Sequence, residues 1–238
     1  MKNFCWLMVT VFCCYFSNHT PSPKISEGAG KLQGFRRFEI SEPAFGLQKV
    51  SAVISNIKTG DEVLDESSYI SLSLPEKFTY NMIHRESFSQ ICTLSLDDGR
   101  KKIFAELPRL PDDLYWSGRQ LKFFTDNKDS ATTLMENCIL KDGWVGLNFK
   151  TIIVNINAKL LTSLIINIYK SDKEDHDLLT VLMLLMKENK YSEFTTSPIY
   201  KDLYERENSS YKSFVDLNDE NEDFIIKCAT NFCNTLSK

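Results

Sequence analysis

The sequence predicts an α+β fold, with an antiparallel β-rich body over residues 35–169 followed by two C-terminal helices. Two patterns lead to this prediction. Short segments rich in β-branched and aromatic residues, separated by turn-forming residues, fill most of the chain up to residue 169. The remainder instead repeats apolar residues at helical spacing. A β-sandwich decorated with helices is the alternative fold that these patterns leave open.

The clearest strand signal lies in residues 89–107. Apolar and polar residues alternate on both sides of Asp98-Gly99, a dipeptide that is typical of hairpin turns. A second hairpin is predicted to turn at Gly143. Residues 151–169 are strongly apolar and enriched in β-branched side chains, so we expect two strands of the central sheet there.

Two amphipathic helices are predicted over residues 172–190 and 220–236. Ser171 and Glu174 have the spacing of a capping box, and a stripe of leucine, valine and methionine follows them. Asp219 introduces the second helix, whose apolar residues recur every three or four positions. Such stripes usually face a protein core, and we expect both helices to pack against the sheet.

The first seventeen residues predict export from the cell. Lys2 precedes an almost unbroken apolar run that ends in polar residues, which is the layout of a secretory signal peptide (residues 1–17). The run is shorter than the roughly 20 apolar residues of a transmembrane helix. We expect cleavage after Ser17, with Cys13 and Cys14 as alternative cleavage positions.

Residues 18–34 are rich in proline, glycine and serine and are expected to form a disordered leader. Residues 35–238 are expected to form one secreted domain, β-rich to residue 169 and helical from residue 170. Arg36-Arg37, at the start of this domain, has two interpretations, a proteolytic processing site or ordinary surface charge.

The charge balance excludes some partners. Without Lys2 the chain has 27 basic and 32 acidic side chains, a formal charge of −5. Nucleic acids and anionic membranes require a basic face, so we expect neither as a partner. We also expect no integral membrane segment in the mature chain, since no second long apolar run follows the first.

Four cysteines remain after the signal peptide: Cys92, Cys138, Cys228 and Cys233. An even number in an exported chain predicts two disulfide bonds. Cys228 and Cys233 are five positions apart on a predicted helix and would point about 140° apart, so each is expected to pair with Cys92 or Cys138. A local 228–233 bond at a frayed helix end, with a 92–138 bond, is the alternative.

Asn208 begins an Asn-Ser-Ser triplet in a polar segment, and in an exported chain it is a predicted glycosylation site. Asn18 also fits the motif but lies at the cleavage point. The acidic run over residues 216–223 lacks the glycine and glutamate positions of a calcium-binding loop, so we interpret it as a solvated helix start.

Residues that could support catalysis are sparse. The chain has three histidines, His19, His84 and His176, and none lies in a known catalytic or zinc-binding motif. Asp112-Asp113 could resemble a carboxylate pair, but adjacent side chains normally point apart. We therefore expect no enzyme activity, no metal and no cofactor.

Three functions remain as hypotheses. The first is a secreted protein that binds an extracellular protein partner, with aromatic-rich loops over residues 112–116 and 191–211 as candidate contact surfaces. The second is a carrier of a lipid or another apolar ligand, for which the apolar region 151–186 would have to enclose a cavity. The third is an enzyme, which would require His84 or His176 to meet a carboxylate in a cleft.

Overall fold

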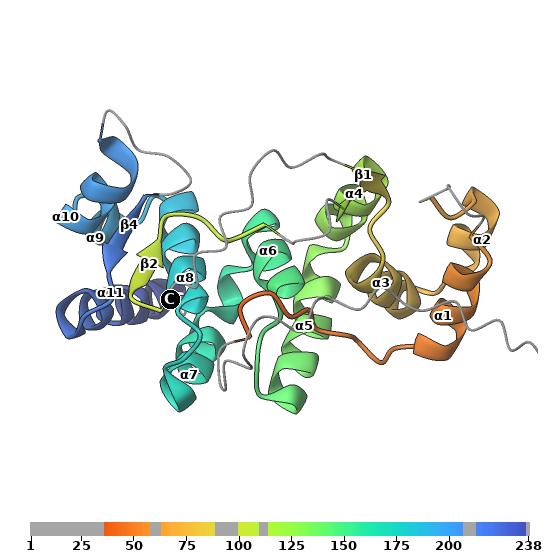
Figure 1. Ribbon diagram of the computed structural model, residues 1–238, viewed down its shortest axis with the longest axis horizontal. Helices are drawn as coiled ribbons and strands as arrows, with labels where there is room; N and C mark the ends of the chain where they lie inside the picture. Colours follow the sequence, from red (N-terminus) through yellow and green to blue (C-terminus); the bar gives the residue numbers. More distant parts are fainter. Residues whose placement is uncertain (1–35, 58–62, 89–99, 110–113, 207–212, 237–238) are drawn as a thin grey trace, which may run out of the picture. The chain divides into compact units, whose positions relative to one another are not determined.

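The computed structural model describes residues 36–57, 63–88, 100–109, 114–206 and 213–236. Helices hold 65% of this part of the chain and strands only 6%. The prediction of an antiparallel β-rich body, like its β-sandwich alternative, is therefore wrong, and helices dominate the fold (Figure 1).

The α-helices within these ranges are α1 (Leu47–Ser55), α2 (Glu66–Ser71), α3 (Leu74–Ile83), α4 (Gly118–Asp126), α5 (Lys128–Asp142), α6 (Leu147–Asn155), α7 (Thr162–Asp172), α8 (Asp177–Glu188), α9 (Ser192–Thr195), α10 (Pro198–Tyr200) and α11 (Asp219–Leu236). Two irregular turns accompany them, the 3₁₀ turn η1 (Lys159–Leu161) and the π-helical turn η2 (Lys201–Glu205). The strands form two antiparallel pairs, β1 (Ser87–Phe88) with β3 (Leu114–Tyr115) and β2 (Lys102–Phe104) with β4 (Phe214–Asp216).

The main core is built around α8. Leu178, Leu182 and Leu185 are fully buried on this helix, and its neighbours α6, α7 and α11 pack against it. A helix that is apolar on most of its circumference is expected at the centre of a core rather than at its surface. On α11, Ile225 and Ala229 face the same core, as the predicted apolar stripe requires.

A second, smaller apolar cluster lies between α1, α2 and α3. We call it the N-terminal cluster, and its buried members are Val50, Leu64, Tyr69, Leu72 and Tyr80. The rings of Tyr69 and Tyr80 meet edge to face at 5.7 Å. Helix α3 serves both sites, because its Phe78 and Met82 belong to the main core while Tyr80 belongs to the N-terminal cluster.

The two strands predicted in residues 151–169 do not form, because α6, η1 and α7 occupy this stretch. Ile152, Ile153 and Ile165 are fully buried in the main core. A β-branched residue lowers helix stability by less than about 1 kcal/mol, whereas burying such a side chain contributes about 1.5–3 kcal/mol. Packing therefore outweighs β-propensity in this stretch.

The hairpin predicted at Gly143 is instead the end of α5. Gly143 has a left-handed backbone (φ 72°), and its N–H donates to the Ile139 carbonyl at 2.9 Å. Asp-Gly suits a hairpin turn and a helix end equally well, because both need a left-handed residue. The first half of the hairpin predicted over residues 89–107 lies outside the described residues, and β2 pairs with β4.

The two C-terminal helices are confirmed, with one corrected boundary. Helix α11 covers the predicted segment, and α8 carries the predicted apolar stripe. Ser171 is in the last turn of α7, so the predicted capping box of Ser171 and Glu174 does not start a helix. Helix α8 begins at Asp177 instead.

Several predictions concern residues that the structure does not describe. The signal peptide over residues 1–17, the leader over residues 18–34, Cys92 and Asn208 all lie outside the described residues. In the part that is described, no helix combines the length and the apolar character needed to span a bilayer.

Candidate functional site

Two capping boxes position the helices that carry a polar network among the described residues. Helix α3 begins after Ser73, whose N–H donates to the Glu76 carboxylate at 2.7 Å. Helix α4 begins after Ser117, whose N–H donates to the Gln120 side-chain oxygen at 3.0 Å. Both are Ser-x-x-Glu/Gln patterns, so these helix starts could have been found in the sequence.

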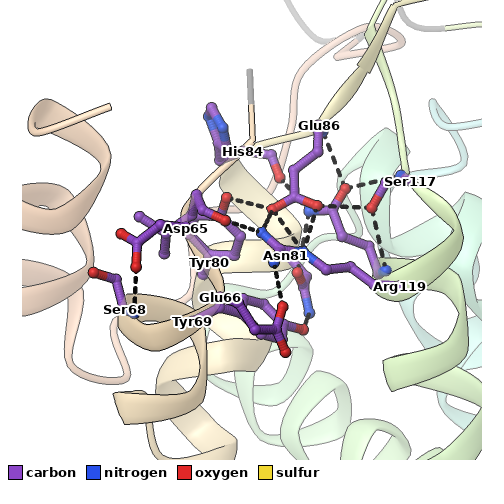
Figure 2. A network of polar contacts seen from close by, with 12 residues as sticks. Asp65, Glu66, Ser68, Tyr69, Tyr80, Asn81, His84, Glu86, Ser117 and Arg119 are labelled. Atoms are coloured by element: carbon purple, nitrogen blue, oxygen red, sulfur yellow. Dashed lines mark hydrogen bonds and ion pairs between the residues drawn. The ribbon is translucent and has the colours of Figure 1, made fainter. Parts of the chain in front are cut away.

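The network is centred on the buried carboxylate of Glu86 (Figure 2). The Tyr80 hydroxyl donates to Glu86 Oε1 and the Ser117 hydroxyl donates to Oε2, each at 2.7 Å. The Arg119 guanidinium donates from Nε to Oε2 at 2.9 Å and from Nη2 to Oε1. Glu86 therefore joins the end of α3 to the first turn of α4.

Arg119 extends the network to α2. Its Nη1 donates to the Glu66 carboxylate at 3.1 Å, and its Nη2 donates to the Leu64 carbonyl at 2.6 Å. The guanidinium carbon lies 4.3 Å from the centre of the Tyr69 ring, a cation–π contact. One arginine thus links α4 to the residues that flank and form α2 (Figure 2).

Gln120 completes the centre of the network with a buried amide. Its oxygen accepts from the N–H groups of Ser117 and Glu86, and its nitrogen donates to the His84 carbonyl at 2.8 Å and to Asn81 Oδ1 at 3.1 Å. All four hydrogen-bonding positions of this amide are used. We call Tyr80, Asn81, Glu86, Ser117, Arg119 and Gln120, together with Leu64, Glu66 and Tyr69, the Glu86 network.

Electrostatics keep the central pair ionised. Burial raises the pKa of Glu86, but hydrogen bonds from Arg119, Tyr80 and Ser117 outweigh burial, and the pKa lies below its ordinary value. Burial by itself would lower the pKa of Arg119. The hydrogen bond to Glu86 outweighs burial, so the pKa of Arg119 lies above its ordinary value. Burial and the neighbouring Glu86 raise the pKa of Tyr80 well above 10. Glu86 and Arg119 therefore form a charged pair at neutral pH.

The network therefore resembles a structural brace more than a reactive centre. The Glu86 carboxylate already has partners at both oxygens, and a general acid or base needs a group free to meet a substrate. Among the described residues, histidines, cysteines and carboxylates do not gather into any group able to hold a metal ion. What the brace can do is hold α2, α3 and α4 in one arrangement.

The two described histidines of the enzyme hypothesis lie at separate places. His84 follows α3 beside the Glu86 network, with its ring 5.2 Å from that of Tyr80. His176 precedes the first residue of α8. Both side chains are partly buried, and they belong to different parts of the fold.

The structure does not place Trp116, from the candidate aromatic surface over residues 112–116, on the protein surface. Trp116 is 8% exposed, and its indole N–H donates to the Asn81 carbonyl at 2.7 Å. Trp116 is therefore a core residue beside the Glu86 network rather than a surface anchor. Asp112 and Asp113 lie outside the described residues.

Cys138 on α5 and Cys228 and Cys233 on α11 are unpaired thiols in the described structure. Burial raises the pKa of Cys138 to about 11 and that of Cys228 to about 12, which makes both thiols poor nucleophiles at neutral pH. Since Cys92 lies outside the described residues, the predicted pairing of these four cysteines stays a prediction.

No protein family, curated protein or solved structure matches the chain. The function must therefore be argued from the chemistry and geometry of the described residues.

Proposed function

We propose that this chain is an exported protein that acts by binding another protein, through a surface held in place by the Glu86 network. The observation that carries this proposal is the position of the exposed apolar side chains. Seven large apolar side chains of the described residues are exposed, and four of them are Val63, Ile70, Phe88 and Leu121. Each of the four is within two positions of a network residue.

The neighbours of these four side chains in the network are Leu64, Tyr69, Glu86 and Gln120. Phe88, at 70% exposed, and Ile70, at 62%, leave most of their surface in water. Exposed apolar side chains that gather on one part of a protein favour a role in binding. The four side chains are carried by segments that the same set of hydrogen bonds connects.

A rigid support strengthens such a role. Binding loses less free energy when the contacting segments are already ordered, because side chains and backbone need not be immobilised on association. The single side chain of Arg119 contacts Leu64 before α2, Tyr69 on α2 and Glu86, which precedes β1. The Glu86 network thus provides the ordering that a binding surface needs.

Export is the second part of the proposal and depends on the sequence. The signal-peptide layout of residues 1–17 and the acceptor triplet at Asn208 both support a route through the secretory pathway. An extracellular protein is then the partner that this chain would meet.

The carrier alternative has weaker support. A cavity for an apolar ligand would leave accessible surface on the side chains that line it. On α8, Leu179, Val181 and Met183 have 0% of their surface exposed, which favours a close-packed interior. A surface hollow of about 700 Å³ beside α11 is lined mainly by charged side chains, among them Lys170, Lys173, Glu222, Asp223 and Lys227.

The binding surface can be tested with paired variants. The double variant Phe88→Asp with Ile70→Asp places charge on the proposed surface, and Leu140→Asp with Leu160→Asp places the same charge on two exposed leucines of α5 and η1. Wild type and both variants, secreted from cultured cells, are used to capture proteins from cell-surface extracts, and bound proteins are identified by mass spectrometry.

The proposal predicts a protein that wild type and the leucine control retain and that the Phe88/Ile70 variant loses by at least about tenfold. Equal capture by all three proteins would contradict the proposed surface. Failure of the wild-type chain to leave the cell, measured by blotting medium and lysate, would contradict export separately.

A further inference from the structure

Residues 36–45, which we call the strap, lead into α1 and begin with the dibasic pair Arg36-Arg37. Phe38, Ile40 and Phe45 of the strap pack against the main core. The sequence leaves two interpretations of the arginine pair, a processing site or surface charge. The structure distinguishes between them, because it places the two arginines in different surroundings.

Arg37 is buried and forms an ion pair. Its Nε donates to the Asp177 carboxylate at 3.2 Å, and the exposed fractions of the two side chains are 7% and 3%. Its guanidinium carbon also lies 4.7 Å from the centre of the Phe104 ring. Asp177 is the first residue of α8, where the helix dipole favours a negative charge. A buried ion pair thus fixes the strap to the main core.

Arg36, in contrast, lies at the protein surface. Its side chain is 57% exposed, 3.8 Å from the Glu39 carboxylate and over the Trp144 ring at 5.1 Å. Contacts of this kind between exposed side chains contribute little to stability. Only the second arginine of the pair is therefore held by the fold.

The strap backbone is fixed as well. The Glu39 N–H donates to the Arg36 carbonyl at 3.1 Å, and the Leu147 N–H donates to the Glu39 carbonyl at 2.8 Å. The chain is consequently turned, rather than extended, at Arg37 and Phe38. A protease active site binds its substrate as an extended strand, so this geometry is unsuitable for cleavage.

Further along the strap, Ser41 is bound by a buried amide. The Ser41 N–H donates to Asn148 Oδ1 at 2.9 Å, and Asn148 Nδ2 donates to the Ser41 and Met82 carbonyls at 2.8 and 3.0 Å. A side chain at Gly146 would place its Cβ 2.1 Å from the Ser41 nitrogen, so glycine is required there. The strap therefore lies too close to the start of α6 to lift without breaking several bonds.

We infer that Arg36-Arg37 is a latent proteolytic site which folding closes, and that the mature chain keeps Arg37, which is anchored in the described folded body. Proteases that cleave after arginine bind its guanidinium with a carboxylate in their own pocket. In the folded chain Asp177 already provides that carboxylate. Only the unfolded or strap-released chain presents Arg37 to a protease.

Cleavage after Arg37 would also be damaging. Hydrolysis would consume one water, convert the Arg37 carbonyl to a carboxylate and leave Phe38 with a new ammonium group. Arg37 would then depart with the upstream fragment, and Asp177 would be left as a buried charge without its covalently tethered partner. An uncompensated buried charge strongly destabilises a fold. Removal of the leader is consequently expected to stop before Arg37.

Limited trypsin digestion of the wild-type chain tests this inference. Arg206, whose side chain is 68% exposed, provides an internal reference bond. In the native protein we expect cleavage after Arg37 to be at least about 100-fold slower than after Arg206, because it requires local opening. In the urea-unfolded chain the two rates should be similar. Native cleavage after Arg37 as fast as after Arg206 would overturn the inference.

Two further measurements use the same readout. Asp177→Asn should accelerate native cleavage after Arg37 by roughly tenfold or more, whereas Asp126→Asn, which removes an exposed carboxylate on α4, should leave it unchanged. The intact mass of the secreted protein should place its N-terminus at or before Arg37. A secreted chain that begins at Phe38 would refute the inference whatever the behaviour of the Asp177 variant.

Discussion

The N-terminal cluster and the main core are stabilised in different ways. The N-terminal cluster contains five buried apolar residues among the described residues, whereas the main core contains thirty-six. Around the small cluster lies the Glu86 network, in which an ion pair and a fully bonded amide join α2, α3 and α4. Along α8, by contrast, most of the buried side chains are apolar, and the buried ion pair with Arg37 lies at the first residue of the helix.

This difference teaches how a small cluster can remain ordered. Five apolar side chains remove too little surface from water to offset the entropy of ordering three helices. Hydrogen bonds and ion pairs also fix how the three helices are arranged, because each buried donor must lie close to its own acceptor. We therefore expect the N-terminal cluster to respond most strongly to loss of a polar partner and the main core to respond most strongly to loss of volume.

The largest effect is expected from Glu86→Ala. The substitution leaves Arg119, Tyr80 and Ser117 without their shared acceptor, and breaking a buried ion pair lowers the free energy of unfolding by about 3–5 kcal/mol. Hydrogen exchange should accelerate in α1–α3 while α8 and α11 stay protected.

Glu188→Ala, which removes an exposed carboxylate on α8, is the matched control and should change stability by less than about 0.5 kcal/mol. Equal loss of protection in α3 and α8 after Glu86→Ala would show that the two regions unfold as one unit, and the comparison would fail.

Leu182→Ala tests the main core. Leu182 is fully buried on α8, and a leucine-to-alanine change at such a site lowers the free energy of unfolding by about 2–5 kcal/mol. Urea denaturation gives the value, and hydrogen exchange should report loss of protection across α7, α8 and α11. Leu160→Ala, at an exposed position of η1, should have almost no effect. A loss below about 1 kcal/mol for Leu182→Ala would mean that the core is loosely packed.

A smaller, stabilising effect is expected from Lys190→Gly. Lys190 follows the C-cap Asn189 of α8 and has a left-handed backbone (φ 49°). The Tyr191 N–H donates to the Met186 carbonyl, and the Lys190 N–H donates to the Lys187 carbonyl. This is a Schellman motif, in which glycine is the favoured residue. The substitution should therefore raise the free energy of unfolding by about 0.5–1 kcal/mol in urea titrations.

Lys141→Gly is the control for that change, because Lys141 lies inside the last turn of α5 and glycine there should lower stability by about 1 kcal/mol. Stabilisation by both glycines, or by neither, would contradict the role of the left-handed position.

The smallest effect is expected at acid pH, near the N-terminal cluster. The Ser73 N–H and then the Lys49 ammonium hold the pKa of Glu76 at about 2. Because the folded-state pKa is below the unfolded one, the stabilisation is present above pH 4.5 and is lost as the pH falls towards 2. The Glu76 side chain is 18% exposed and that of Lys49 is 49% exposed, so solvent screening keeps the effect small.

Glu76→Gln removes this titration. The difference in urea midpoint between wild type and Glu76→Gln should shrink between pH 4.5 and 2, with wild type the more stable at neutral pH. A difference that stays constant over this range would show that Glu76 is not ionised through its bond to Ser73.

Local signals in the sequence account for part of the fold. The apolar stripe on α8 and the amphipathic pattern of α11 are predicted correctly. Each helix has one exposed end or face whose residues interrupt the apolar ones, so the helical spacing is visible in the sequence. The starts of α3 and α4 also have local signals, the capping boxes Ser73–Glu76 and Ser117–Gln120. These signals indicate helices in a region where β-propensity alone predicts strands.

The candidate site was not predictable in the same way. Glu86 and Arg119 are 33 positions apart, Leu64 and Arg119 are 55 apart, and Arg37 and Asp177 are 140 apart. No local periodicity or spacing relates such residues. The prediction of a surface role for Trp116 was wrong, since composition alone does not distinguish a surface anchor from a buried ring with a satisfied N–H.

The sequence by itself determined where the amphipathic C-terminal helices lie, which charge the chain carries, and which segment predicts export. The tertiary structure alone decided that residues 151–169 are helical, that Glu86 meets Arg119, and that Arg37 is buried while Arg36 is not. The physical reason is the distance along the chain over which each interaction acts. Caps and amphipathic stripes act between residues a few positions apart, whereas burial on all sides removes the periodic signal and leaves packing between distant segments to choose the structure.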